Sequence, residues 1–127
     1  MKPLAISSTC IIILLAIWSF FIYYANNTLN DMADELDDLI YIPVSAEEWE
    51  TAREEFALVS MQWHQDKTIL YMLSQHGTTR DIDVAFARLE EHLKNETKPE
   101  ALLEIAIIKE HFRTIQQYEA FSIDNIF

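Results

Sequence analysis

The chain has 127 residues, half of them hydrophobic, and a formal net charge of −12. Its length suits one domain with a single appendage, and its charge repels nucleic acid and anionic lipid, which argues against a nucleic-acid partner. The one cysteine, Cys10, excludes an intrachain disulfide, and the one glycine, Gly77, excludes a glycine-rich phosphate-binding loop.

Residues 4–24 carry no charge and predict a transmembrane helix, because a helix of this length spans roughly the 30 Å of a bilayer's hydrocarbon core. Three alternatives fit less well. A cleaved signal peptide would have a shorter apolar core and a small residue in place of Tyr23. A lipoprotein would need an apolar stretch before Cys10, and a buried helix of so small a protein would not be apolar on every side. We therefore expect an uncleaved anchor whose residues 4–24 contact membrane lipid.

Basic residues set the expected orientation of this anchor. Lys2 precedes it, and no Lys or Arg lies between Tyr24 and Arg53. Since the basic side of a span stays cytoplasmic, we expect a single-pass protein of the cell membrane with a cytoplasmic N-terminus. The predicted domains are a transmembrane anchor, 1–24, and an extracytoplasmic helical domain, 25–127, which holds all 21 acidic residues.

Beyond the anchor, apolar residues recur at three- and four-residue steps, which predicts amphipathic helices. The first is expected to run from the membrane to about Ile40 and to end before Pro43. Whether the polar residues 26–28 break this helix is left open by the sequence. Its predicted buried face consists of Leu29, Met32, Leu36 and Leu39.

A second helix is predicted from Ser45, which forms a capping box with Glu48. Gly77, which can adopt positive φ, is expected to end it. Asp66 interrupts its apolar face and is predicted to be a partly exposed acid paired with a neighbour, either Lys67 or a residue of a partner helix. That face consists of Trp49, Ala52, Phe56, Val59, Trp63, Leu70 and Leu73.

Two further helices are predicted from similar patterns. One begins at Thr78 and ends near Asn95, and the other begins at Thr97 with Pro99 in its first turn. Short turns make neighbouring helices antiparallel. The predicted fold class is therefore all-α, with a single N-terminal transmembrane helix followed by a small antiparallel helical bundle. The predicted core of these two helices consists of Ile82, Ala85, Phe86, Leu89, Leu93, Leu102, Ile105, Ile108, Phe112 and Ile115.

No motif predicts catalysis. The chain has no nucleophile elbow around a serine, and its histidines lack the partner spacing of a bundle metal site. We expect no enzyme activity, no cofactor and no bound metal, and we interpret the acidic stretch from Asp31 to Glu55 as a solvated face. Trp49, Phe56 and Trp63 could line a pocket, although large aromatics more often fill the core of a small bundle.

The chain resembles one known family, the small membrane-anchored family of Firmicutes catalogued as domain of unknown function 4363. The resemblance covers almost the whole chain and implies no assigned activity. It implies a possible partner, a multi-spanning membrane protein of the YetF type, and it directs attention to His76, Asn125 and Phe127 beside the aromatic residues. The resemblance depends on the anchor, Trp49-x-x-Ala52, Trp63, His76, the Ile82–Leu89 segment and the terminal Asn125-Ile126-Phe127.

Two functions of different classes remain open from the sequence. The first is a membrane-anchored extracytoplasmic interaction module, accessory to a membrane or envelope protein, which predicts an exposed apolar patch. The alternative is an extracytoplasmic small-ligand or cation-binding protein, which predicts a cavity between Trp49, Phe56 and Trp63. The candidate partner or pocket residues are Trp49, Phe56, Trp63, His76, Asn125 and Phe127.

The predicted orientation has a direct test. A cysteine introduced at Ser122 should react with a membrane-impermeant thiol reagent on intact cells that lack an outer barrier, because residues 25–127 are expected outside. The unmodified chain, whose single cysteine lies in the apolar segment, gives the background signal. Labelling that occurs only after cell lysis would reverse the orientation.

Overall fold

The computed structural model describes residues 2–73 and 76–126, with the side chains of 2–71 and 77–117. This part of the chain is almost entirely helical and contains no strand, which confirms the all-α fold class. The elements are α1 (Lys2–Glu35), the π-helix η1 (Leu36–Tyr41), α2 (Ile42–Ser45), α3 (Trp49–Leu73), α4 (His76–Lys94) and α5 (Lys98–Ile126).

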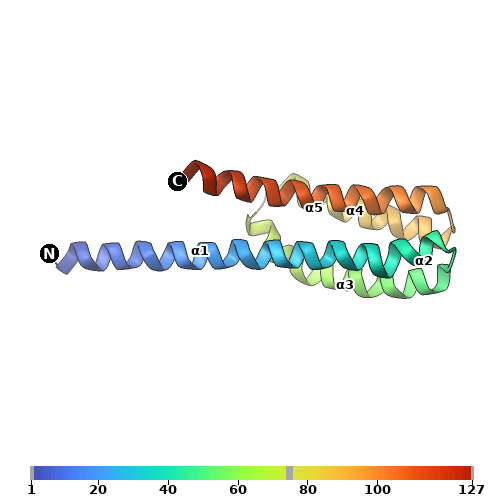
Figure 1. Cartoon of the computed structure of the whole chain (residues 1–127), viewed down its shortest axis with the longest axis horizontal. Coiled ribbons are helices and arrows are strands. Elements are labelled where there is room, and N and C mark those ends of the chain that lie inside the picture. Colours follow the sequence, from blue (N-terminus) through green and yellow to red (C-terminus); the bar gives the residue numbers. More distant parts are fainter. Residues whose placement is uncertain (1, 74–75, 127) are drawn as a thin grey trace.

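Four helical arms run alternately up and down, as the sequence predicted (Figure 1). The first arm, which we call the N-terminal rod, consists of α1, η1 and α2 joined without a break. The rod packs against α3 on one side and α5 on the other, and α4 closes the bundle between α3 and α5. The bundle is therefore a four-sided arrangement in which each arm contacts two neighbours.

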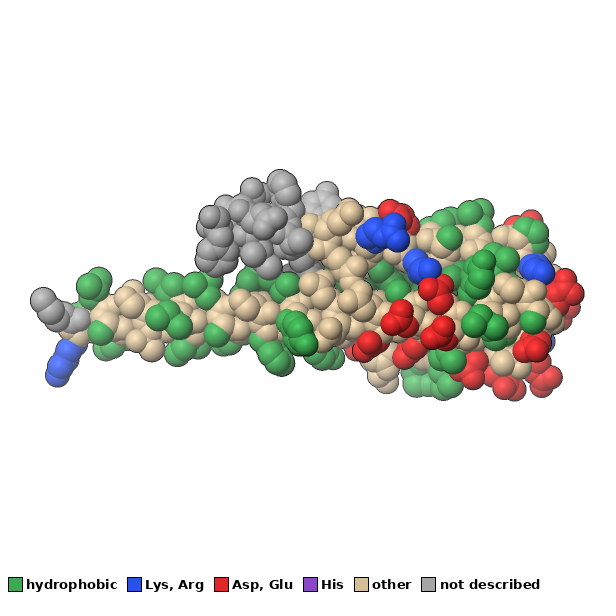
Figure 2. Space-filling view, in the orientation of Figure 1, with side chains coloured by type: hydrophobic (Ala, Val, Ile, Leu, Met, Phe, Trp, Pro, Cys, Tyr) green, Lys and Arg blue, Asp and Glu red, His purple; other side chains and the backbone are tan. Residues whose placement is uncertain are grey.

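The first part of α1 projects beyond the other arms (Figure 1). Its apolar side chains are exposed on every side, whereas the acidic side chains gather over the bundle (Figure 2). Burial in the bundle begins at Ile22, and the core cluster begins at Ala25. Among the described residues, the helix Lys2–Ser45 is the one candidate membrane span by length and composition.

The sequence predicted that the first helix ends before Pro43, and this prediction was wrong. The rod continues through Pro43 to Ser45. Ile42 keeps helical φ and ψ of −65° and −50° in front of the proline, and its N–H bonds to the carbonyl of Asp37, five residues earlier. A proline ring needs room beside the preceding turn and brings no N–H to it. The wider turn of η1 provides that room, which is why the helix survives the proline.

The π-helix also changes which residues face the core. A regular α-helix would continue the buried face from Leu36 to Leu39, as predicted, but a π-turn closes over five residues instead of four. Ile40 and Val44 are consequently fully buried, while Leu39 is 36% exposed. The prediction was therefore wrong for Leu39, although it was right for Leu29, Met32 and Leu36, which belong to the core.

The capping box predicted at Ser45 is absent, because Ser45 is the last residue of α2. The N–H of Glu48 bonds to the carbonyl of Pro43 at 2.8 Å and that of Glu47 bonds to Val44 at 3.0 Å, while Glu47 adopts a φ of 59°. This pair of bonds with a left-handed residue is a Schellman motif. Helix α3 then begins at Trp49, four residues later than the capping box predicted.

A matching turn joins α4 to α5 at the same end of the bundle. Glu96 has a φ of 56°, and the N–H of Thr97 bonds to the carbonyl of His92 at 3.0 Å. Helix α5 begins after Thr97 as predicted, with Pro99 in its first turn. The Thr97 hydroxyl, however, bonds to the ring and the carbonyl of His92, at 3.0 and 3.3 Å.

Gly77 does not terminate a helix, contrary to the prediction. Helix α4 begins at His76, so Gly77 lies in its first turn, and no described glycine has positive φ. Helix α4 ends at Lys94, one residue before the predicted end. The sequence signal failed because a glycine with space around it is tolerated inside a helix as well as after one.

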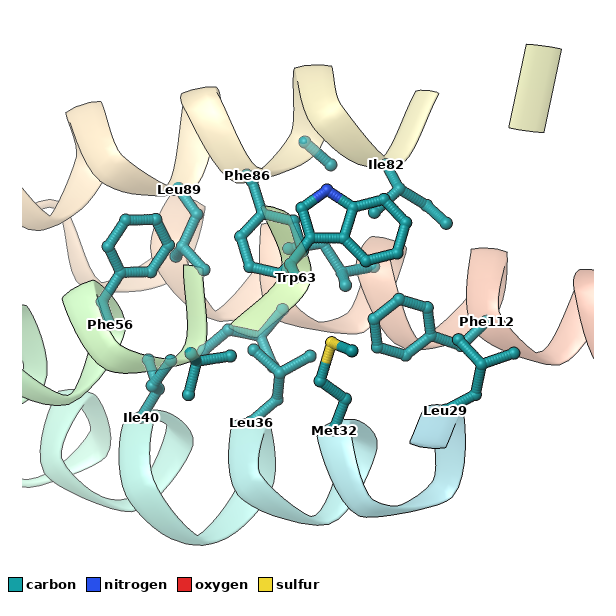
Figure 3. Packing of buried hydrophobic residues seen from close by; sticks show 14 of the residues in the cluster. Leu29, Met32, Leu36, Ile40, Phe56, Trp63, Ile82, Phe86, Leu89 and Phe112 are labelled. Atoms are coloured by element: carbon teal, nitrogen blue, oxygen red, sulfur yellow. The ribbon is translucent and has the colours of Figure 1, made fainter. Parts of the chain in front are cut away.

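The core is centred on Trp63, whose side chain is fully buried (Figure 3). Its ring stacks on Phe86 of α4 at 5.7 Å between centroids and contacts Phe112 of α5 at 5.9 Å. The indole N–H donates to the carboxylate of Asp83 at 2.7 Å, so its one polar group is satisfied. Met32 and Leu36 of the rod lie on the other side, so Trp63 connects all four arms.

Trp63→Ala is expected to lower the free energy of unfolding of fragment 25–127, which contains the whole core cluster, by about 3 to 5 kcal/mol. The cause is an emptied aromatic site together with an Asp83 carboxylate that loses its donor. Urea denaturation measures the change, with Leu103→Ala at an exposed position as the control. A loss below about 1 kcal/mol would contradict the central packing of Trp63.

Candidate functional site

Two hollows meet along the boundary between the N-terminal rod and α3, and we call them together the α1–α3 groove. The first, of about 240 Å³, lies nearer the projecting part of α1 and is mostly polar. The second, of about 370 Å³, lies farther along the rod and is mostly apolar. Glu35 and Gln62 line both hollows, so the groove is continuous.

The polar hollow contains three carboxylates. Its lining residues are Tyr24, Thr28, Asp31, Met32, Glu35, Gln62 and Asp66. Asp66 was predicted to be partly exposed and paired with Lys67 or a residue of a partner helix, but it is only 7% exposed and accepts a hydrogen bond of 2.7 Å from the Gln62 amide of its own helix. Lys67 instead pairs with Asp83 at 3.6 Å. The prediction failed because the rod covers this side of α3, which the sequence of α3 alone does not show.

Burial raises the pKa of the Glu35 carboxyl above its ordinary 4.5, and the charges of Asp31 and Asp66 raise it further. Burial disfavours the ionised form, and nearby like charges do the same. Glu35 therefore lies, partly desolvated and beside two other carboxylates, at the point where the polar and apolar hollows join.

The apolar hollow exposes large hydrophobic side chains to solvent. Leu58 and Met61 of α3 are 59% and 54% exposed, and Leu39 of η1 faces them across the groove. The full lining is Glu35, Leu39, Glu55, Leu58, Val59, Met61, Gln62 and Gln65. The floor of this hollow is therefore apolar, with carboxylates and amides around it.

The opposite side of the rod is closed by α5 through polar contacts. The Lys109 ammonium bonds to both carboxylate oxygens of Asp37, in η1, at 2.8 and 2.9 Å. Nearer the projecting part of α1, the Gln116 amide donates to the side-chain oxygen of Asn30 at 2.8 Å. These contacts fix the orientation of the rod, so that Leu39 is held toward α3.

A third hollow, of about 220 Å³, lies between α3 and α4. It has basic as well as acidic residues, since Arg53 and Lys94 line it together with Glu90. Arg53 already donates to the Leu93 carbonyl at 3.2 Å and pairs with Glu96 at 3.4 Å. The mixed charge and these existing contacts distinguish this hollow from the α1–α3 groove.

The three aromatic candidates do not form one site. Trp49 is half-buried and packs on the edge of the core, while Trp63 lies at the centre. Phe56 is buried beside Phe86, at 6.0 Å between ring centroids, and contributes one wall of the α3–α4 hollow. The Phe86 ring lies between Phe56 and Trp63 and contacts both (Figure 3).

The remaining candidates fall on positions that are not described in full. The backbone places His76 at the first residue of α4 and Asn125 near the end of α5. Their side chains, and Phe127 altogether, lie outside the described residues.

Leu39, Val59 and Asp66 were named from the sequence as parts of helix faces, but the sequence did not predict that they line a groove. A signal for the groove was available in the sequence of α3. Leu58 and Met61 are large apolar residues three positions apart, and they lie off the helix face that carries the predicted core aromatics, which indicates exposure to solvent. Leu39 carried no such signal, since its exposure depends on the π-turn. Within the ranges whose side chains are described, no cluster of three or more potential metal ligands is found.

Comparison with known proteins gives a family and no closer relative. The family model described as a domain of unknown function (DUF4363) matches residues 19–126. The match thus includes the end of the apolar segment and the bundle with its groove. No curated protein and no solved structure matches the chain.

The contribution of Glu35 to the stability of fragment 25–127 is expected to fall as the pH rises from about 4.5 toward neutrality. Because the folded pKa of Glu35 lies above its ordinary value, the folded state binds this proton more tightly than the unfolded state, and its stabilising effect is lost as the pH rises through the folded pKa. Glu35→Gln should flatten this part of the pH profile of the unfolding midpoint and raise the midpoint at neutral pH. Glu54→Gln, at an exposed position of α3, removes the same charge and serves as the control. Equal effects of the two variants would refute a special role for Glu35.

Proposed function

We propose that this chain, which belongs to the DUF4363 family, is a membrane-anchored interaction module. In this proposal the bundle stands on the extracytoplasmic side of the cell membrane, with the N-terminus in the cytoplasm. It serves as an accessory to a membrane or envelope protein and has no catalytic role of its own.

The α1–α3 groove carries this proposal. A small bundle gains stability by burying large apolar side chains, yet Leu58, Met61 and Leu39 remain in contact with solvent in one hollow. Exposed apolar surface rimmed by polar groups is characteristic of protein–protein contacts. The π-helix that exposes Leu39 supports the same conclusion, because such turns occur frequently at functional sites.

The continuous rod supports a partner in or near the membrane. The helix that forms one wall of the groove is also the candidate membrane span. Tyr24, the last residue of the predicted anchor, lines the polar hollow, so the groove begins close to the expected bilayer surface. Glu35, where the apolar hollow begins, lies about 16 Å farther along the helix. A multi-spanning membrane protein has extracytoplasmic loops at this height, and the YetF-type protein is the specific candidate that we propose.

Site-specific cross-linking in native membranes tests this function. A photo-reactive residue in place of Leu58 is expected to give one discrete adduct with a membrane or envelope protein, because the groove is occupied in the cell. The same residue in place of Leu103 is a matched control, since both leucines are 59% exposed but only Leu58 lines the groove.

The adduct at position 58 should disappear when Met61→Lys is added, because that change places a charged chain on the apolar floor. Adducts of equal yield at positions 58 and 103 would contradict the proposed function, as would an adduct that Met61→Lys leaves intact.

A further inference from the structure

We propose that the occupant of the α1–α3 groove is a basic amphipathic helical segment of the partner, with its apolar face on the groove floor and its Lys or Arg residues beside the groove carboxylates. This inference rests on the proposed function and specifies the chemistry of the partner. A helix that inserts its apolar face into a groove is a common mode of recognition.

The shape of the apolar hollow fits a helix. The lining residues of α3 run from Glu55 to Gln65, a distance of about 15 Å along the axis, which corresponds to about three helical turns of a docked segment. Leu58 and Met61 lie one turn apart along this line, with Leu39 opposite. Apolar residues at three- and four-residue spacing on a docked helix would meet these side chains in turn. Met61 is well suited to this contact, because methionine adapts to different apolar partners.

The charge of the groove selects a basic occupant. Four carboxylates line its two hollows. Asp31 and Asp66 line the polar hollow, Glu55 lines the apolar hollow, and Glu35 lines both. Neither lining contains a Lys or Arg. Like-charge repulsion from Asp31 and Asp66 contributes to the raised pKa of Glu35, and a cationic side chain beside Glu35 would oppose that repulsion.

The same charge argues against a second copy of this chain as the occupant. The predicted outer domain, residues 25–127, has 21 acidic residues and 8 basic ones, so its net charge is −13. Two such domains repel each other over the Debye length of the medium. A basic segment is attracted instead, and electrostatic complementarity of this kind also directs approach and register.

Binding of a synthetic helix to the full chain in zwitterionic lipid nanodiscs tests the inference. The probe is a labelled Leu–Lys peptide of about 14 residues, with leucines at helical spacing. A scrambled peptide of equal composition and a Leu–Glu peptide of equal pattern are the controls, and empty nanodiscs give the lipid background. The amphipathic basic peptide should bind most tightly, and its affinity should fall as salt rises from about 50 mM to about 500 mM, because screening weakens the attraction.

A matched pair of variants assigns this binding to the groove. Leu58→Lys should raise the Kd by at least about tenfold, because it removes an apolar contact and adds a repelling charge. Leu103→Lys, at a position of equal exposure elsewhere, should change it by less than about twofold. Equal losses in both variants, or equal affinity for the Leu–Lys and Leu–Glu peptides, would overturn the inference.

A second measurement needs no substitution. In the unmodified chain with labelled methionine methyl groups, the NMR signal of Met61, which lines the apolar hollow, should shift on addition of the Leu–Lys peptide and should not shift on addition of the Leu–Glu peptide. A Met61 signal that does not move when the Leu–Lys peptide binds would place binding elsewhere and overturn the inference. If the cross-linked adduct at position 58 forms and is lost in Met61→Lys, but the Leu–Lys peptide binds no more tightly than the Leu–Glu peptide, the partner chemistry is wrong and the proposed function stands. If there is no such adduct and no tighter binding of the Leu–Lys peptide, both proposals fail.

Discussion

The register of one helix determines both the core and the surface of this bundle. The N-terminal rod has to place an apolar residue against the core at every turn while it passes Pro43. The π-turn meets both needs, because it makes room for the proline ring and advances the buried face by one position. Ile40 and Val44 are buried as a result, and Leu39 turns toward α3. The position of Leu39 in the groove is thus a direct consequence of how the rod accommodates a proline.

Much of the fold could be predicted because its apolar pattern is strong. The three- and four-residue spacing placed the arms and most of the core, and Thr97 was correctly taken as the start of the last helix. The failures occurred where a local signal fits two structures. Ser45 and Glu48 match a capping box, yet the chain forms a Schellman turn there, and Gly77 lies within a helix although it was expected to end one.

The candidate site was less accessible to sequence reasoning than the fold. Its lining comes from two arms, and the burial of Asp66 depends on the rod that lies over it. Glu104 is a similar case, because this acid is buried in α5 beside Arg88 of α4, at 2.8 Å, a contact that neither helix shows alone. The burial of a side chain that is covered by a second helix cannot be predicted from the apolar periodicity of its own helix. Trp49, Phe56 and Trp63 were candidate pocket residues because they are large and aromatic, but residues of this size pack into or against the core of the bundle.

The unbroken rod has a mechanical consequence. The chain between Tyr24 and the end of α2 at Ser45 extends for about 32 Å as one helix, with no joint between the candidate membrane span and the bundle. Membrane-spanning helices are tilted by about 20° on average, and such a tilt displaces the far end of a 32 Å lever by about 11 Å parallel to the membrane. In the proposed arrangement, any change of the tilt or rotation of the span in lipid would therefore swing the groove as a rigid arm, and the position of the binding surface would report the geometry of the bilayer below it.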